Sequence, residues 1–317
     1  MNITGLHHVT AIASDPQRNL EFYVGVLGLR LVKRTINFDD PGSYHFYFGD
    51  GVGTPGTILT FFPWPDARPG VRGVGEIEAT AFAIPAASVG YWLDRLKEHH
   101  VVAWRAPERF GDEIICLADP DGMLLELIAS TPGNEVQPWT EGPVPVEQSI
   151  RGLHSVSAAL ETREGTTILL TESFGYRLIQ EAGNRARFAA PGEGGTGKTI
   201  ELVCTPGSRP GRLGPGSVHH IAFRVPDDAR QHAWREKIVS LGYSVSPVMD
   251  RIYFRSIYFR EPSGILFEIA TDSPGFTNDE TVDELGAKLR LPPWLAGARP
   301  QIEEVLPKIV LPTKAIL

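Results

Sequence analysis

Cysteine is scarce in this sequence, with Cys116 and Cys204 as the two cysteines among its 317 residues. Two scattered cysteines are no disulfide framework of the kind that stabilises small secreted domains, so that class of protein is excluded. Each cysteine lies within or beside an apolar, strand-like run. We therefore expect two buried thiols rather than a bridge.

Long apolar segments and an excess of positive charge are also absent. No apolar run approaches the ~20 residues of a membrane-spanning helix, and no secretory signal is evident before the first predicted strand. The formal net charge is −8, and no clustered basic face suggests nucleic-acid binding. With 42% hydrophobic and 21% charged residues, the composition is that of an ordinary globular protein. We expect a cytoplasmic enzyme that binds neither membranes nor nucleic acids.

What the sequence does contain is an internal repeat, which is the first feature to interpret in any chain. Three segments of the first half have counterparts in the second half: residues 5–10 (GLHHVT) match 152–157 (GLHSVS), 79–85 (ATAFAIP) match 220–226 (HIAFRVP), and 119–126 (DPDGMLLE) match 261–268 (EPSGILFE). The chain is therefore expected to be an internal duplication.

Apolar periodicity and Gly/Pro turns predict four similar units, each a strand, a helix and two or three further strands. The first strands are expected at residues 6–13, 78–84, 153–160 and 218–225. The helix of the first unit is expected to end at Gly28, and the helix of the second unit is expected to contain Val89 and Leu96. The helices of the third and fourth units are expected at residues 166–173 and 229–241. The other strands are expected at 30–36, 44–48, 57–62, 113–118, 123–128, 176–179, 185–189, 199–203, 252–259 and 265–270.

These units predict an α+β fold with four βαβββ modules in two tandem halves. The N-terminal pair of modules would span residues 1–135 and the C-terminal pair 148–275, joined by a Pro- and Gly-rich linker. Residues 276–317 are expected to form a tail that packs on the body or on a partner chain.

The two halves differ at the positions where a metal ion could be held. One set of equivalent positions carries His8, His220 and Glu268, and the other carries Ser155, Ala79 and Glu126. Two imidazoles and a carboxylate make a facial triad with open coordination positions, as in non-haem Fe(II) oxygenases. Ser, Ala and Glu make no such set. The first set is therefore the predicted metal site.

Glu268 lies in an otherwise apolar strand and needs a positive partner there. Burial of an unpaired carboxylate is costly and raises its pKa. A metal ion would supply the charge, but an ion pair with Arg251 or Arg255 would do so as well. Glu126 occupies the equivalent position without both histidines. Glu268 alone is therefore weak support for a metal, and the three positions together carry the prediction.

The histidines occur as pairs, His7-His8 and His219-His220, each at the head of an equivalent strand. Neighbouring strand residues point to opposite faces, so one histidine of each pair is expected to face a given cavity. His8 shares its face with Thr10, and His220 shares its face with Ala222. These small neighbours leave room for a ligand.

Fe(II) suits this ligand set, because two neutral imidazoles and one carboxylate leave up to three positions open on a six-coordinate ion. Mn(II) is compatible with the same ligands. Catalytic zinc sites also use three protein ligands, so ligand number does not exclude zinc.

The four units and the positions of these ligands resemble the vicinal oxygen chelate superfamily, which includes glyoxalases, bleomycin resistance proteins and dioxygenases. More narrowly, nearly the whole chain is similar to hydroquinone-type ring-cleaving dioxygenases. The similarity rests on residues 5–10, 44–50 (YHFYFGD), 56–57 with 60–63 (TFFP), 275–277 (GFT) and 291–293 (LPP). It implies an Fe(II) site that uses O2 to open a para-dihydroxylated aromatic ring.

Carried over residue by residue, the resemblance implies metal ligands at His8, His220 and Glu268. Around the metal it implies five further site residues: His7, Thr10, His219, Arg251 and Tyr258. Tyr258 or a flanking histidine would move protons, and Arg251 would stabilise negative charge. Structural alternatives stay open for all five. Arg251 could pair with Asp250, Tyr258 and Thr10 could be packing residues, and His7 and His219 could point away from the cavity.

Three functions compete at this point. The leading one is a ring-cleaving dioxygenase for hydroquinone-type rings, with a catechol extradiol dioxygenase as its nearest alternative. A glyoxalase-like isomerase or lyase would use Zn or Ni, but generally needs a further carboxylate or amide ligand that the repeat does not supply. A metal-free binding module would need only an aromatic groove. The expected partners are a small aromatic substrate and O2, and scaffolds of this kind often form homodimers.

Overall fold

Residues 3–130, 136–192 and 195–312 are described by this computed structural model, and they form four consecutive modules. The first consists of β1 (Leu6–Ala13), α1 (Pro16–Leu20) with a π-helical turn (Glu21–Val26), β2 (Arg30–Asn37), β3 (Asp40–Gly49) and β4 (Ile58–Pro63). The second consists of β5 (Glu76–Pro85), a 3-10 turn (Ala86–Ser88), α2 (Val89–Glu98), β6 (Ala103–Arg105), β7 (Ile114–Ala118) and β8 (Leu124–Ser130).

The second half repeats this order. The third module consists of β9 (Leu153–Leu160), α3 (Glu164–Ile168) with a π-helical turn (Leu169–Phe174), β10 (Arg177–Ala182), β11 (Arg185–Ala189) and β12 (Thr199–Cys204). The fourth consists of β13 (Ser217–Val225), α4 (Asp228–Ser240), β14 (Met249–Asp250), β15 (Arg255–Arg260) and β16 (Leu266–Thr271). Three 3-10 turns (Phe276–Asn278, Val282–Glu284 and Pro293–Ala298) and α5 (Arg299–Val305) follow.

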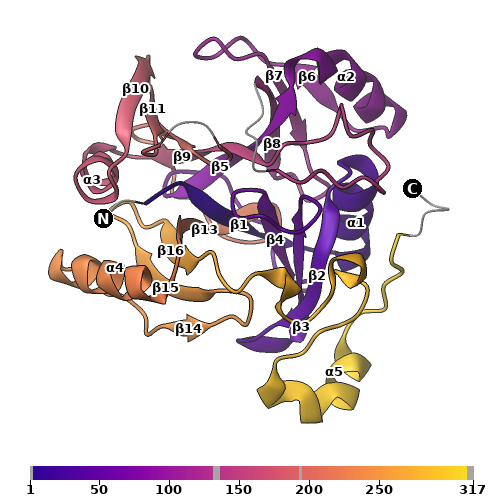
Figure 1. Cartoon of the computed structure of the whole chain (residues 1–317). Helices are drawn as coiled ribbons and strands as arrows, with labels where there is room; N and C mark the ends of the chain where they lie inside the picture. The colour runs from indigo at the N-terminus through magenta and orange to yellow at the C-terminus, as the bar shows by residue number, and fades with distance from the viewer. Residues whose placement is uncertain (1–2, 131–135, 193–194, 313–317) are drawn as a thin grey trace.

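The modules pair crosswise into two eight-stranded sheets (Figure 1). The first and fourth modules share the sheet β14-β15-β16-β13-β1-β4-β3-β2, and the second and third share β10-β11-β12-β9-β5-β8-β7-β6. At the centres, β1 runs antiparallel to β13 and β5 runs antiparallel to β9. The predicted α+β fold of four modules is confirmed, and each sheet takes one module from each half. The predicted domain boundaries stay a prediction, and residue 135 lies outside the described residues.

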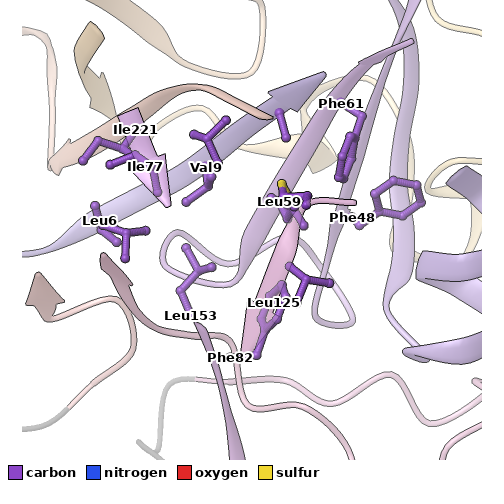
Figure 2. Close-up of a cluster of buried hydrophobic side chains, with 14 of the residues drawn as sticks. Leu6, Val9, Phe48, Leu59, Phe61, Ile77, Phe82, Leu125, Leu153 and Ile221 are labelled. Atoms are coloured by element: carbon purple, nitrogen blue, oxygen red, sulfur yellow. The ribbon is translucent and has the colours of Figure 1, made fainter. Parts of the chain in front are cut away.

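Apolar side chains from both sheets meet in one core (Figure 2). Leu6, Val9, Phe61 and Ile221 of the first sheet belong to the same buried cluster as Phe82 of the second. Because strand residues alternate between faces, the residues between these apolar positions point to the opposite face of each sheet. In the first sheet, that opposite face carries the candidate site.

Each of the four central strands contains a β-bulge at an equivalent place. In the pairing of β1 with β13, the register shifts at His7 and at His219, which are the extra residues. In the pairing of β5 with β9, it shifts in the same way at Glu78 and His154. A bulge interrupts the alternation of faces and re-aims the neighbouring side chains. Both histidine pairs therefore lie at positions where strict alternation fails.

Most predicted helices and strands are present, but β6 and β14 were not predicted. The strand predicted at 252–259 begins at Arg255, because Ile252 has a φ of 69°, which a β-branched residue in a strand does not adopt. Cys116 is buried as expected, whereas Cys204 is partly exposed. No helix in the described parts of the chain is long and apolar enough to cross a membrane.

The segment after β16 packs on the first module. Lys33 of β2 is completely buried and forms ion pairs with Asp279 and Glu280. The hydroxyl of Tyr44 donates a hydrogen bond to the carbonyl of Pro307 (3.1 Å). These contacts hold the segment beside the outer strands of the first sheet.

Candidate metal centre

Three neighbouring strands of the first sheet bring His8, His220 and Glu268 together. They lie on β1, β13 and β16, respectively, and all three side chains are buried. The Nε2 atoms of His8 and His220 lie 3.3 Å and 2.9 Å from Oε2 of Glu268. One potential ligand atom from each residue lies within 4.8 Å of the others. The three residues that the sequence singled out therefore point at one position.

The carboxylate of Glu268 tests whether a cation fits this position. Its Oε1 accepts a hydrogen bond from Oγ of Ser256 (2.5 Å), but its buried Oε2 has no hydrogen-bond partner. Burial opposes ionisation, yet the adjacent imidazoles of His8 and His220 outweigh it and hold the pKa of Glu268 well below its ordinary value. An ionised oxygen facing two imidazole nitrogens fits a divalent cation bound by two His and one Glu.

The arginines considered as partners of Glu268 have other partners. Arg251 forms an ion pair with Asp39 (2.9 Å), and Arg255 forms one with Asp228. The alternative that Arg251 pairs with Asp250 is not observed, although Asp250 is its neighbour in sequence. Neither arginine pairs with Glu268, which favours a metal ion over an arginine as the positive partner of this carboxylate.

The second histidine of each pair supports the first. Nδ1 of His7 lies 2.9 Å from Nδ1 of His8, and Nδ1 of His219 lies 2.8 Å from Nδ1 of His220. Burial, followed by the charge of the adjacent histidine, lowers the pKa of His7 well below 6.5 and that of His219 to about 3. Neutral His7 and His219 can accept the Nδ1 protons, which leaves each Nε2 lone pair free for a metal.

The expectation that one histidine of each pair faces the cavity was wrong for the second pair. His219 and His220 both line the cavity, whereas His7 is absent from its wall and packs against Phe254. A bulge at His219 interrupts the alternation on which the expectation depended, although the equivalent bulge at His7 does not bring His7 to the cavity.

A cavity of about 360 Å³ opens beside the three residues. Aromatic and aliphatic side chains form much of its wall: Phe38, Phe62, Trp64, Phe254 and Leu266. The rings of Phe62 and Trp64 are nearly parallel (8°), with centroids 5.8 Å apart, and the ring of His219 is roughly perpendicular to both. The cavity is therefore suited to a small, flat molecule.

Arg251 and Tyr258 lie together on this wall. The Nε of Arg251 donates to the Tyr258 hydroxyl (3.3 Å), and its guanidinium lies 5.5 Å from the centre of the tyrosine ring. The Tyr258 ring is also in edge contact with His220. Burial first, and then the charge of Glu268, raise the pKa of Tyr258, so this hydroxyl keeps its proton near neutral pH. Both residues line the cavity beside the three converging side chains, and their roles in a reaction stay a prediction.

Thr10 belongs to a partly buried chain of hydrogen bonds whose other members were not predicted as site residues. The Thr60 hydroxyl donates to Thr10 (2.9 Å), Nε2 of His45 lies 2.8 Å from Thr60, and Nδ1 of His45 lies 2.9 Å from the Tyr47 hydroxyl. Burial, followed by the charges of neighbouring groups, keeps the pKa of His45 well below 6.5. His45 and Tyr47 also line the cavity. Their alternation along β3 was the signal that could have identified them.

The equivalent place in the second sheet is filled by ion pairs. The guanidinium of Arg109 donates to both oxygens of Glu126 (3.0 Å and 2.6 Å), and its Nε lies 3.1 Å from Glu201. Glu201 also pairs with Arg185 and Arg187. Among residues 3–130, 136–192 and 195–312, the group in the first sheet is the one set of metal-ligating side chains that converges in this way.

Comparisons with known proteins agree with this geometry. The model of the Glyoxalase/Bleomycin resistance protein/Dioxygenase superfamily matches residues 5–127 and 167–269. "Putative ring-cleaving dioxygenase MhqO" of Bacillus subtilis is 46% identical over 302 residues, which cover 95% of each chain. Chlorohydroquinone/hydroquinone 1,2-dioxygenase of Sphingobium indicum is 36% identical over 306 residues, again covering 95% of each chain.

Solved structures extend the comparison. The crystal structure of a "putative dioxygenase" from Bacillus subtilis has a TM-score of 0.94 at 44% identity and covers 98% of this chain and 99% of that chain. Glyoxalase I of Zea mays has a TM-score of 0.64 at 16% identity, over 85% of this chain and 93% of that chain, which shows a shared fold alone. The chain therefore belongs to the Glyoxalase/Bleomycin resistance protein/Dioxygenase superfamily and, within it, to the family of these ring-cleaving dioxygenases.

Proposed function

We propose that this protein is an Fe(II)-dependent dioxygenase that opens hydroquinone-type aromatic rings with O2. The observation that carries the proposal is the buried convergence of His8, His220 and Glu268, with Oε2 of Glu268 free of hydrogen bonds, on the wall of an aromatic cavity. Similarity over almost the full length to chlorohydroquinone/hydroquinone 1,2-dioxygenase supports the same class of reaction.

His8 and His220 would hold the metal through Nε2, and Glu268 through Oε2. When bound, Fe(II) supplies open coordination positions and the redox chemistry that the reaction of O2 with an aromatic ring requires. Mn(II) fits the same ligands. A glyoxalase-type site would generally need a further carboxylate or amide ligand, and the His, Cys, Asp and Glu side chains that converge here among the described residues are three.

The aromatic wall would bind and orient the substrate ring. A volume of about 360 Å³ lies at the lower end of small-molecule cavities, roughly 300–1,000 Å³, and suits a single substituted ring. Phe62 and Trp64 offer parallel faces for stacking, and the surrounding apolar side chains exclude water. Such a wall fixes the ring beside the metal ligands.

Tyr258, His219 and Arg251 would manage protons and charge. Because burial raises the pKa of Tyr258, its hydroxyl stays protonated and can donate a hydrogen bond to a substrate oxygen. Neutral His219 also lines the cavity, and with its Nδ1 accepting from His220 its Nε2–H can donate a hydrogen bond. The guanidinium of Arg251 carries a permanent positive charge that stabilises negative charge developing on the substrate.

Oxygen uptake tests this proposal. Protein loaded anaerobically with Fe(II) is mixed with O2 and, in separate reactions, with hydroquinone, catechol or a glutathione hemithioacetal. We expect rapid uptake with hydroquinone and an equal amount of ring-opened product. Preference for catechol, isomerisation of the hemithioacetal without O2 uptake, or failure to retain metal would each contradict the proposal in favour of a stated alternative. The cytoplasmic location and the homodimer stay predictions.

A further inference from the structure

Two equivalent arginines follow the same backbone path in the two sheets. Arg109 lies seven positions before Cys116, the cross-strand neighbour of Glu126, and Arg251 lies seven positions before Tyr258, the cross-strand neighbour of Glu268. The residue after each arginine has a positive φ, 59° in the second sheet and 69° in the first. The amide of Arg109 donates to the carbonyl three residues ahead (3.3 Å), and the amide of Arg251 does the same (3.0 Å).

Their side chains nevertheless take different partners. Arg109 extends to Glu126 and binds both of its oxygens. Arg251 binds Asp39 (2.9 Å) and the hydroxyl of Tyr258 (3.3 Å), and Glu268 keeps Oε2 without a hydrogen bond. The same backbone thus presents an arginine that neutralises the glutamate in one sheet and leaves it available in the other.

Two features of the first sheet account for the difference. The residue across from Glu126 is the small Cys116, and Arg109 reaches both oxygens of that glutamate. The residue across from Glu268 is Tyr258, whose ring lies under the guanidinium of Arg251 at 5.5 Å. Asp39 lies at the turn between β2 and β3, where its amide donates to Oδ1 of Asn37 (3.0 Å). From there its carboxylate, on a side chain that is 60% exposed, forms the ion pair with Arg251 on the wall of the cavity.

We propose that Tyr258 and Asp39 are positioning residues that hold Arg251 away from Glu268 and so keep the carboxylate free to bind a metal. The inference rests on the metal site of the proposed function and concerns how that site stays open. An arginine fork and a divalent cation compete for the same carboxylate, because each can neutralise it. Any contact that stabilises Arg251 in a position away from Glu268 therefore increases the affinity of the site for a metal ion.

Mn(II) titration of substituted proteins tests the inference without turnover. Tyr258→Ala removes the ring without adding a thiol that could bind metal, and Tyr258→Phe is the matched control that keeps the ring. We expect Tyr258→Ala to weaken Mn(II) binding about tenfold or more, the equivalent of one charge-assisted hydrogen bond gained by the competing arginine. Tyr258→Phe loses only the 3.3 Å hydrogen bond from Arg251 and keeps the ring, so it should weaken Mn(II) binding clearly less than Tyr258→Ala does. Asp39→Asn should weaken binding in the same direction by a smaller factor.

Removal of the arginine separates competition from structural damage. In the double variant Tyr258→Ala/Arg251→Gln, no guanidinium can reach Glu268, so Mn(II) affinity should return to that of the unmodified protein. A general loss of structure at position 258 would not be rescued in this way. Unchanged affinity in Tyr258→Ala, or a lack of rescue in the double variant, would overturn the inference.

A crystal structure of Tyr258→Ala decides the question even if the unmodified protein binds no metal, an outcome that would count against the proposed function instead. Contact between the Arg251 guanidinium and Oε2 of Glu268 would support the inference. A guanidinium that remains on Asp39 alone would contradict it.

Discussion

The two sheets hold an equivalent glutamate in different ways. In the second sheet, both oxygens of Glu126 accept hydrogen bonds from Arg109. In the first sheet, Oε2 of Glu268 lies beside His8 and His220 without a hydrogen bond. A buried carboxylate needs a positive partner, and leaving it alone is costly. The sheets therefore differ in the cation they are built for, an arginine side chain in one and a metal ion in the other.

The largest expected effect comes from removing a histidine of the first sheet. His220→Ala should lower metal affinity by more than about 100-fold and abolish turnover, because a direct ligand counts for more than the groups that orient it. Metal content after desalting and O2 uptake measure both losses. Ser155→Ala, at the position of the second sheet equivalent to His8, is the control and should change neither. A His220→Ala protein that retains metal and activity would refute the assignment.

Loss of the arginine of the second sheet should act on stability instead. Arg109→Gln leaves the buried carboxylate of Glu126 without a positive partner and removes one of the positive charges beside Glu201. The free energy of unfolding should therefore fall by about 3–5 kcal/mol. Urea unfolding followed by circular dichroism measures the change. Metal affinity of the folded variant should stay constant, since the metal site lies in the other sheet. A loss below about 1 kcal/mol would mean that the ion pair contributes no more than a surface pair.

Acidification should weaken the second sheet through Glu201. Burial opposes ionisation of this carboxyl, but Arg109, Arg187 and Arg185 outweigh it and lower its pKa below 4.5. A lowered folded-state pKa means that the unfolded chain binds the proton more readily, so this stabilisation is complete above about pH 4.5 and is lost as the pH falls through the folded value. Unfolding free energies between pH 6 and pH 3 should fall less steeply for Glu201→Gln. Equal slopes would exclude Glu201 as a source of acid sensitivity.

The smallest expected effect concerns the hydrogen-bonded chain beside the metal ligands. Thr60→Val removes the hydrogen bond to Thr10 and the partner of His45 while keeping the shape of the side chain. Because a neutral hydrogen bond contributes about 1 kcal/mol, kcat should fall roughly fivefold with metal content unchanged. Ser157→Ala, at the position of the second sheet equivalent to Thr10, should leave kcat unaltered. Full activity in Thr60→Val would limit this chain to packing.

The internal repeat made much of this architecture predictable. Four modules follow from repeated strand, helix and turn signals, and the three converging residues follow from comparing the halves at equivalent positions. The crosswise pairing of modules could not be read in the same way, because every module offers a similar edge strand and sequence periodicity does not say which two edges meet.

The detailed site was less accessible from sequence. The orientation of His219 depends on a bulge, which shifts faces by one residue and has no strong local signal. Asp39 reaches Arg251 from a turn far away in the chain, so no spacing rule connects them. The equivalence of Arg109 and Arg251, by contrast, could have been found by extending the repeat seven positions back from the cross-strand partners of the two glutamates.

The crosswise pairing has a consequence for biosynthesis. β1 is made first, yet its antiparallel neighbour β13 and the strand that carries Glu268 belong to the last module. The second and third modules can join while the chain is still being synthesised, whereas the opening module must wait, with an unpaired edge, for the closing one. Such long-range pairing slows folding and exposes strands to aggregation. A chain that ended before the fourth module would lack His220 and Glu268, two of the three side chains that converge on the candidate metal site.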